Sequence, residues 1–176
     1  MFGILISPVN DNLVMGKTVL NSKSPLGSFL LLSSGAIVGI IALGHIAIIF
    51  GGAEWFRAFG AGERMATMAE NGSFLPALSA FAIAVILMVW SLYAYCGATC
   101  RFRLPFLKSC LLIISSIFIL RGVVGIASLF LPRDGHVFST YDFYFMLITS
   151  AGSFYLGITY LIGVLKQWEF IKSSIV

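Results

Sequence analysis

The chain has 176 residues, of which 59% are hydrophobic and 10% are charged, and its mean hydropathy is +1.01. An average soluble domain carries about 25% charged residues, so this composition excludes a water-soluble globule and requires lipid around much of the surface. The net charge of +4 comes from basic residues near the ends of apolar stretches, which indicates orientation in a membrane rather than binding of nucleic acid.

Residues 1–24 precede the first long apolar stretch and are predicted to form an N-terminal cytoplasmic tail. The apolar start of this tail lacks the basic region and the small-residue cleavage site of a secretory signal. Met1 and Met15 are both compatible with the start of translation, and the sequence leaves this choice open.

Four apolar stretches predict an all-α, polytopic membrane protein that forms a four-transmembrane-helix bundle. The predicted spans cover about residues 27–50, 75–97, 108–131 and 143–165. Each has 23 or 24 residues, enough to cross roughly 30 Å of hydrocarbon as a helix, and a helix satisfies its own backbone hydrogen bonds. The transmembrane domain is therefore predicted at residues 25–166, and a C-terminal cytoplasmic tail at 167–176.

Lysine and arginine residues predict the orientation of the bundle, because they concentrate on the cytoplasmic side of membrane proteins. Seven fall on one predicted side, namely Lys17, Lys23, Arg101, Arg103, Lys108, Lys166 and Lys172. Three fall on the other side, namely Arg57, Arg64 and Arg133. Both termini are therefore expected to be cytoplasmic, and the loops at 51–74 and 132–142 to face outward.

The first outer loop, residues 51–74, is predicted to contain a short helix at 63–71. Gly51 and Gly52 are expected to end the first span, and Gly72 to stop the short helix. Two interpretations of this loop stay open: a lid packed down for stability, or a gate for a substrate.

Small residues recur on the predicted spans, where they allow helices to approach closely. Gly35 and Gly39 form a G-x-x-x-G face, Gly122 and Gly125 thin the third span, and Gly157 lies on the fourth. These faces are expected to pack within one bundle. The alternative is that the Gly35/Gly39 face makes a homodimer or docks a partner.

Arg121 lies near the middle of the third span, where a charged residue costs at least about 2.5–3.5 kcal/mol. A long side chain can extend toward the interface, so its guanidinium is expected in the outer half of the membrane. The residues predicted at that level or at the outer boundary are His45, Glu54, Ser79, Thr149, Ser153 and Asp142. This polar cluster is either a structural network around a buried arginine or a site for a polar or anionic ligand, including a proton-linked path.

No catalytic residue, cofactor or metal site is predicted. His45 and His136 are poorly placed for a shared haem, because His136 falls in an outer loop. Cys96, Cys100 and Cys110 lie at the predicted cytoplasmic end, where small, apolar core residues are the favoured interpretation.

Three segments carry a resemblance to a known group of proteins. They are GHIAIIFGGAEWFRAFGAGERMA at 44–66, NGSFLPAL at 71–78 and LRGVVG at 120–125. Together they resemble uncharacterised small four-helix bacterial inner-membrane proteins, over roughly residues 30–165. The resemblance implies a multi-pass protein of the bacterial inner membrane and implies no activity, because none is known for that group.

The favoured function is that of a non-enzymatic binding or accessory component, a class that includes membrane immunity proteins. Its expected partners are the lipid bilayer and either further copies of itself or a membrane or periplasmic protein. The main alternative is a small oligomeric transporter or channel for a polar or anionic solute. An enzyme or redox subunit is the third class, and an optical spectrum would test it.

Overall fold

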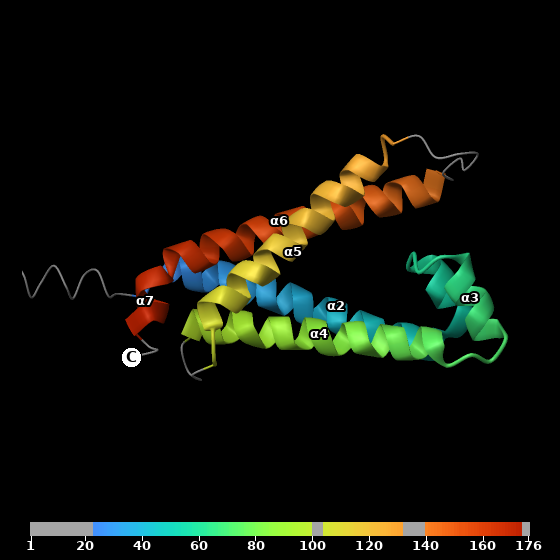
Figure 1. Ribbon diagram of the computed structural model, residues 1–176, viewed down its shortest axis with the longest axis horizontal. Helices are drawn as coiled ribbons and strands as arrows, with labels where there is room; N and C mark the ends of the chain where they lie inside the picture. The colour runs from blue at the N-terminus through green and yellow to red at the C-terminus, as the bar shows by residue number, and fades with distance from the viewer. Residues whose placement is uncertain (1–22, 100–103, 132–139, 174–176) are drawn as a thin grey trace, which may run out of the picture.

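A computed structural model describes residues 23–99, 104–131 and 140–173. In order, the helices are α2 (Pro25–Ala58), α3 (Glu63–Glu70), α4 (Leu75–Thr99), α5 (Leu107–Ser128), α6 (Thr140–Lys166) and α7 (Trp168–Ser173) (Figure 1). The described residues contain no strand, and α2, α4, α5 and α6 are long and apolar enough to cross a membrane. The all-α prediction with four spanning helices is confirmed. Some residues named in the sequence analysis lie outside the described ranges, namely Met1, Met15, Lys17, Cys100, Arg101, Arg103, Arg133 and His136.

Helix α2 runs eight residues beyond the predicted end of the first span and is interrupted rather than ended at Gly52. Gly52 has φ 66° and ψ −156°, a conformation that only glycine adopts readily. Helix resumes after this kink and continues to Ala58. It then ends in a turn at Gly60, whose φ is 73°, with Ala61 N–H donating to Phe56 O at 2.9 Å.

Helix α3 occupies the position predicted for a short loop helix. It ends in a second turn of the same kind, in which Gly72 has φ 73° and Ser73 N–H donates to Met68 O at 3.0 Å. The buried side chains of Ile48, Phe56, Ala66 and Ala80 join α3 to α2 and α4 in a small cluster. The loop helix is therefore packed against one pair of spanning helices.

The four long helices form two close pairs, α2 with α4 and α5 with α6. Small residues bring each pair together: a Cβ added to Gly35 would lie 2.9 Å from Ala94 Cβ, and one added to Gly157 would lie 2.7 Å from Ile119 N. Serine hydroxyls reinforce the same contacts. Ser91 donates to Gly35 O at 2.7 Å, and Ser115 donates to Gly157 O at 3.1 Å. Such contacts hold helices together where the surrounding lipid is as apolar as the side chains.

The two pairs converge at the end that carries α7 and diverge toward α3 (Figure 1). We call the convergent part the closed end. Leu31, Leu111 and Tyr160 are fully buried there. Within the predicted C-terminal tail at 167–176, residues 168–173 form α7, and Ile171 on it is buried in the main core.

A buried glutamine links the helices of the closed end. Gln167 Nε2 donates to Ser28 Oγ at 2.5 Å, and Gln167 Oε1 accepts from Ser24 N–H at 3.1 Å. Ser24 also caps α2, because its hydroxyl accepts from Gly27 N–H at 3.2 Å. The start of α2 and the end of α6 are thus joined by polar contacts as well as by apolar packing.

A cleft between the diverging helix pairs

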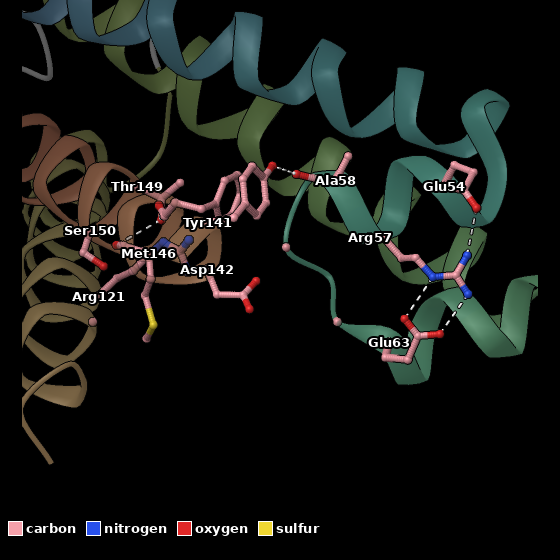
Figure 2. Close-up of a pocket in the computed structure, with 14 residues that line it drawn as sticks. Glu54, Arg57, Ala58, Glu63, Arg121, Tyr141, Asp142, Met146, Thr149 and Ser150 are labelled. Carbon is pink, nitrogen blue, oxygen red and sulfur yellow. Dashed lines mark hydrogen bonds and ion pairs between the residues drawn. The ribbon is translucent and has the colours of Figure 1, made fainter. Parts of the chain in front are cut away.

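The divergent end contains a cleft of about 980 Å³ (Figure 2). Its walls come from the end of α2, the α2–α3 connection, the start of α3, the C-terminal half of α5 and the N-terminal half of α6. The lining residues are Glu54, Arg57, Ala58, Gly60, Gly62, Glu63, Arg121, Gly125, Tyr141, Asp142, Phe145, Met146, Thr149 and Ser150. This volume is in the range of small-molecule sites.

Arg121 supplies the positive charge among the described residues of the α5–α6 wall. Its Nε donates to Ser153 Oγ at 3.1 Å, and Ser153 Oγ in turn donates to Thr149 O at 2.8 Å. Among the residues that the structure describes, none pairs with the two terminal nitrogens of Arg121. One edge of the guanidinium is thus anchored to α6, and the rest can donate to a bound group.

Arg57 dominates the opposite wall and is surrounded by carboxylates (Figure 2). Its Nε and one terminal nitrogen form a two-pronged contact with Glu63 at 2.9 and 2.8 Å, and its other terminal nitrogen lies 3.0 Å from Glu54 and 2.8 Å from Glu70. The hydrogen bonds from Arg57 lower the pKa of the Glu63 carboxyl below its ordinary value. This ion network ties the end of α2 to both ends of α3.

Two contacts bridge the cleft between its walls. The Tyr141 hydroxyl donates to Ala58 O at 2.6 Å. Phe145 packs so closely on Gly60 that a Cβ at position 60 would collide with its ring. The start of α6 is therefore held against the end of α2 by one hydrogen bond and one ring contact, whereas the closed end is joined by a continuous core.

The structure brings together part of the predicted polar cluster. Four of its members line the cleft, namely Arg121, Glu54, Thr149 and Asp142. A fifth, Ser153, accepts a hydrogen bond from Arg121. The two other members lie away from the cleft lining and hydrogen bond within their own helices: the His45 ring to Ile41 O at 2.9 Å and Ser79 to Pro76 O at 2.8 Å.

Sequence reasoning missed Arg57, Glu63 and Tyr141 as members of this site. Arg57 was counted only as an outer-loop charge. The spacing of Glu54 and Arg57, three residues apart, was an available signal, because such residues are neighbours on a helix. The ion pairs of Arg57 with Glu63 and Glu70 could not be predicted from sequence spacing, because they depend on how α3 packs against the end of α2.

The predicted packing glycines all mark close helix contacts. A Cβ at Gly122 would lie 2.7 Å from Phe154 N, and one at Gly125 would collide with Ser150. A Cβ at Gly39 would lie 3.2 Å from Ser91 Oγ. The Gly35/Gly39 face thus contacts α4 of the same chain.

The cleft can bind charged groups through its arginines and carboxylates, and no histidine or cysteine is among its described lining residues. The described ranges also hold no group of three or more His, Cys, Asp or Glu residues that could bind a metal ion. Comparisons with models of protein families, with curated proteins and with solved structures found no match to this chain.

Proposed function

We propose that this chain is a non-enzymatic protein of the bacterial inner membrane that acts as a binding or accessory component. Both termini lie in the cytoplasm, and the cleft faces outward, where it holds a polar or anionic ligand at Arg121. The positive-inside rule supports this orientation. The four spanning helices of the described residues support it as well, since an even number of crossings returns the two ends of that segment to one side.

The observation that carries the proposal is the guanidinium of Arg121. It lies on a membrane-spanning helix, faces the cleft, and has two terminal nitrogens without a partner in the described part of the chain. A purely structural arginine in a membrane protein satisfies its donors within the fold. Arg121 does so with Nε only, and the remaining donors suit an oxyanion.

The closed end supports a binding role over a transport role. A transporter or channel for a polar or anionic solute needs access from both sides of the membrane. Here Leu31, Leu111 and Tyr160 fill the space between the helix pairs at the closed end. In proteoliposomes, efflux of inorganic phosphate that Arg121→Ala abolishes without unfolding the protein would reverse this choice.

Cysteine labelling tests the proposal without knowledge of the ligand. In a background without native cysteines, Met146→Cys places a thiol on the cleft wall, and Ile148→Cys places a matched thiol on the exposed face of the same helix. An impermeant maleimide added outside sealed right-side-out vesicles is expected to label Met146→Cys and to spare Ile148→Cys. Equal labelling of both thiols would contradict a water-filled cleft, and labelling only from the cytoplasmic side would reverse the orientation.

Occupancy of the cleft is read from the same thiol. Met146→Cys is expected to react several times more slowly in native membranes than after purification and removal of lipid, because the occupant is then lost. Arg121→Gln is expected to abolish this difference. Equal rates in the two preparations would show that nothing occupies the cleft and would overturn the binding proposal.

A further inference from the structure

We infer that the ligand of the cleft is a membrane phospholipid, with its phosphate at Arg121 and its acyl chains along the adjoining face of α5. This inference rests on the proposed function and names the class of ligand for the same site. It follows from the unpaired nitrogens of Arg121, from the exposed apolar residues beside it, and from its distance to the end of α5.

The guanidinium of Arg121 suits a phosphate group. Its Nε donates to Ser153 Oγ, and its two terminal nitrogens have no partner among the residues that the structure describes. These nitrogens present their hydrogens in one plane, an arrangement that matches two oxygens of a phosphate. A bound phosphate would also neutralise a cation on a membrane-spanning helix, where an uncompensated charge is costly.

Arg121 lies at the border between the cleft and the exposed surface of α5. On one side of it, Gly125 lines the cleft and packs against Ser150 of α6. On its other side, Ile117 and Val124 are exposed. Residues three or four positions apart are neighbours on a helix surface, so an apolar chain lying on these two residues would bring its polar end within reach of Arg121.

The exposed residues beside Arg121 belong to an apolar stripe that continues along α5. Four exposed residues form this stripe, namely Ile113, Ile117, Leu120 and Val124. From the level of Arg121 it runs toward the closed end, where Leu111 is buried in the core. The acyl chains of a lipid in the leaflet on the α3 side run in the same direction, from the headgroup into the membrane. A water-borne anion would leave this stripe unused.

The position of Arg121 along α5 also favours a ligand that belongs to the bilayer. Arg121 lies seven residues before Ser128, the last residue of α5, which is about 10 Å at 1.5 Å per residue. A long side chain can cover part of this distance toward the interface, and a charge at such depth draws headgroups inward by thinning the bilayer locally. A phospholipid can therefore bring its phosphate to Arg121 while its chains stay in the hydrocarbon.

The carboxylates at the mouth of the cleft do not select the rest of the headgroup. Glu54 and Glu63 both pair with Arg57 (Figure 2), and Asp142 takes part in an interaction of its own within the protein. These groups are already engaged, so we assign them no role in binding an amine. The phosphate, which different phospholipids share, is therefore expected to decide the affinity.

Native mass spectrometry of the purified full chain tests the inference. Phosphatidylglycerol, phosphatidylethanolamine and diacylglycerol of identical acyl chains are added in separate samples at equal concentration, and soluble sn-glycerol 3-phosphate in a fourth. Adducts of both phospholipids are expected to exceed those of diacylglycerol by about tenfold, the effect of one charge-assisted contact. Soluble glycerol phosphate is expected to bind weakly, because it lacks the chains that contact the stripe.

Two pairs of variants locate the lipid. Arg121→Gln is expected to reduce phospholipid binding to the level of diacylglycerol, whereas Arg64→Gln, at an exposed arginine of α3 outside the cleft lining, leaves it unchanged. Val124→Gln on the stripe is expected to weaken phospholipid binding several times. Val123→Gln is its matched control, because Val123 is 49% exposed against 55% for Val124 but lies about 200° around α5 from Arg121. Both valines are exposed, so this pair keeps the test decisive if Arg121→Gln fails to fold.

The remaining outcomes separate this inference from the proposed function. Equal binding of diacylglycerol and the phospholipids would overturn the assignment of the phosphate, and equal effects of Val124→Gln and Val123→Gln would overturn the placement of the chains. Strong binding of soluble glycerol phosphate that Arg121→Gln abolishes would identify a water-borne anion; it would overturn the lipid assignment and leave the binding site standing. Equal labelling rates at Met146→Cys in native membranes and after removal of lipid would overturn both.

Discussion

The closed end and the cleft end use the same kinds of residue to opposite effect. At the closed end, Gln167 binds both Ser28 and Ser24, and apolar side chains from the two helix pairs fill the space around them. At the cleft end, Arg121 binds Ser153 through one nitrogen and leaves two nitrogens facing a cavity. Polar side chains whose donors and acceptors are all paired stabilise a membrane bundle. Side chains with unpaired donors can instead bind a ligand.

The largest expected effect breaks the helix pairing that both ends share. Gly157→Val would place atoms 2.6 Å from Ile119 Cγ1 and 2.7 Å from Ile119 N, so α5 and α6 must separate. We expect the free energy of unfolding in mixed micelles to fall by about 3 kcal/mol. Gly152→Ala on the same helix is the control: its Cβ meets open space, so stability is expected to rise by about 0.5–1 kcal/mol. Equal losses for both variants would contradict the close contact.

The second effect weakens the closed end alone. Gln167→Ala removes a fully buried amide and leaves Ser24 N–H and Ser28 Oγ without this partner. Losing a buried partner costs about 1–3 kcal/mol per group left unsatisfied, so we expect a loss of about 2 kcal/mol in the same unfolding assay. Glu169→Ala, on the exposed face of α7, is expected to change stability by less than about 0.5 kcal/mol. If Gln167→Ala is as stable as this control, the polar contacts of Gln167 do not stabilise the closed end.

The third effect opens the cleft end alone. Tyr141→Phe removes the hydrogen bond to Ala58 O across the cleft, worth about 0.5–1.5 kcal/mol. Spin labels at Arg64→Cys on α3 and Tyr144→Cys on α6, in a chain without native cysteines, report the separation of the walls. We expect a broader distance distribution with a longer mean, and no change for Tyr155→Phe, which lies farther along α6. An unchanged distribution in Tyr141→Phe would mean that packing alone sets the cleft.

The smallest effect is a response to acid at the mouth. Arg57 lowers the pKa of Glu63 below its ordinary value of 4.5. The Arg57–Glu63 contact is therefore fully present above that value and is lost as the pH falls through the lower pKa of the folded protein. Spin-label distances between α3 and α6 are expected to be constant above pH 5 and to broaden below the ordinary value of Glu63. Glu63→Gln is expected to reduce the broadening of the distances at low pH. Broadening as large as in the unsubstituted protein would mean that other carboxyl groups cause it.

The sequence predicted the parts of the fold that depend on local hydrophobicity. Spans of about twenty apolar residues are recognisable because each one must satisfy its own backbone in lipid. Helix α4 begins at Leu75 as predicted, and α3 begins at Glu63. Glycine spacing also predicted where helices approach closely, because Gly35 and Gly157 leave no side chain between the backbones.

The divergence of the two helix pairs could not be read from the sequence. Hydrophobicity is nearly uniform around each span, so it does not reveal which face meets which neighbour. His45 and Arg121 were therefore matched by depth alone, although His45 turns back to Ile41 O of its own helix. The continuation of α2 past Gly52 had no signal either, since a glycine pair is equally typical of a helix end. These features arise from packing between segments that are distant in the sequence.

The divergence of the helix pairs also changes how the protein fits into its bilayer. Helices that meet at one end and separate toward the other give the molecule a wedge-shaped outline (Figure 1). A wedge displaces unequal lipid area in the two leaflets, with more on the side that carries α3. Lateral pressure in that leaflet then pushes the two helix pairs toward each other. Membrane curvature and tension therefore affect how far apart the two pairs stand at the cleft end.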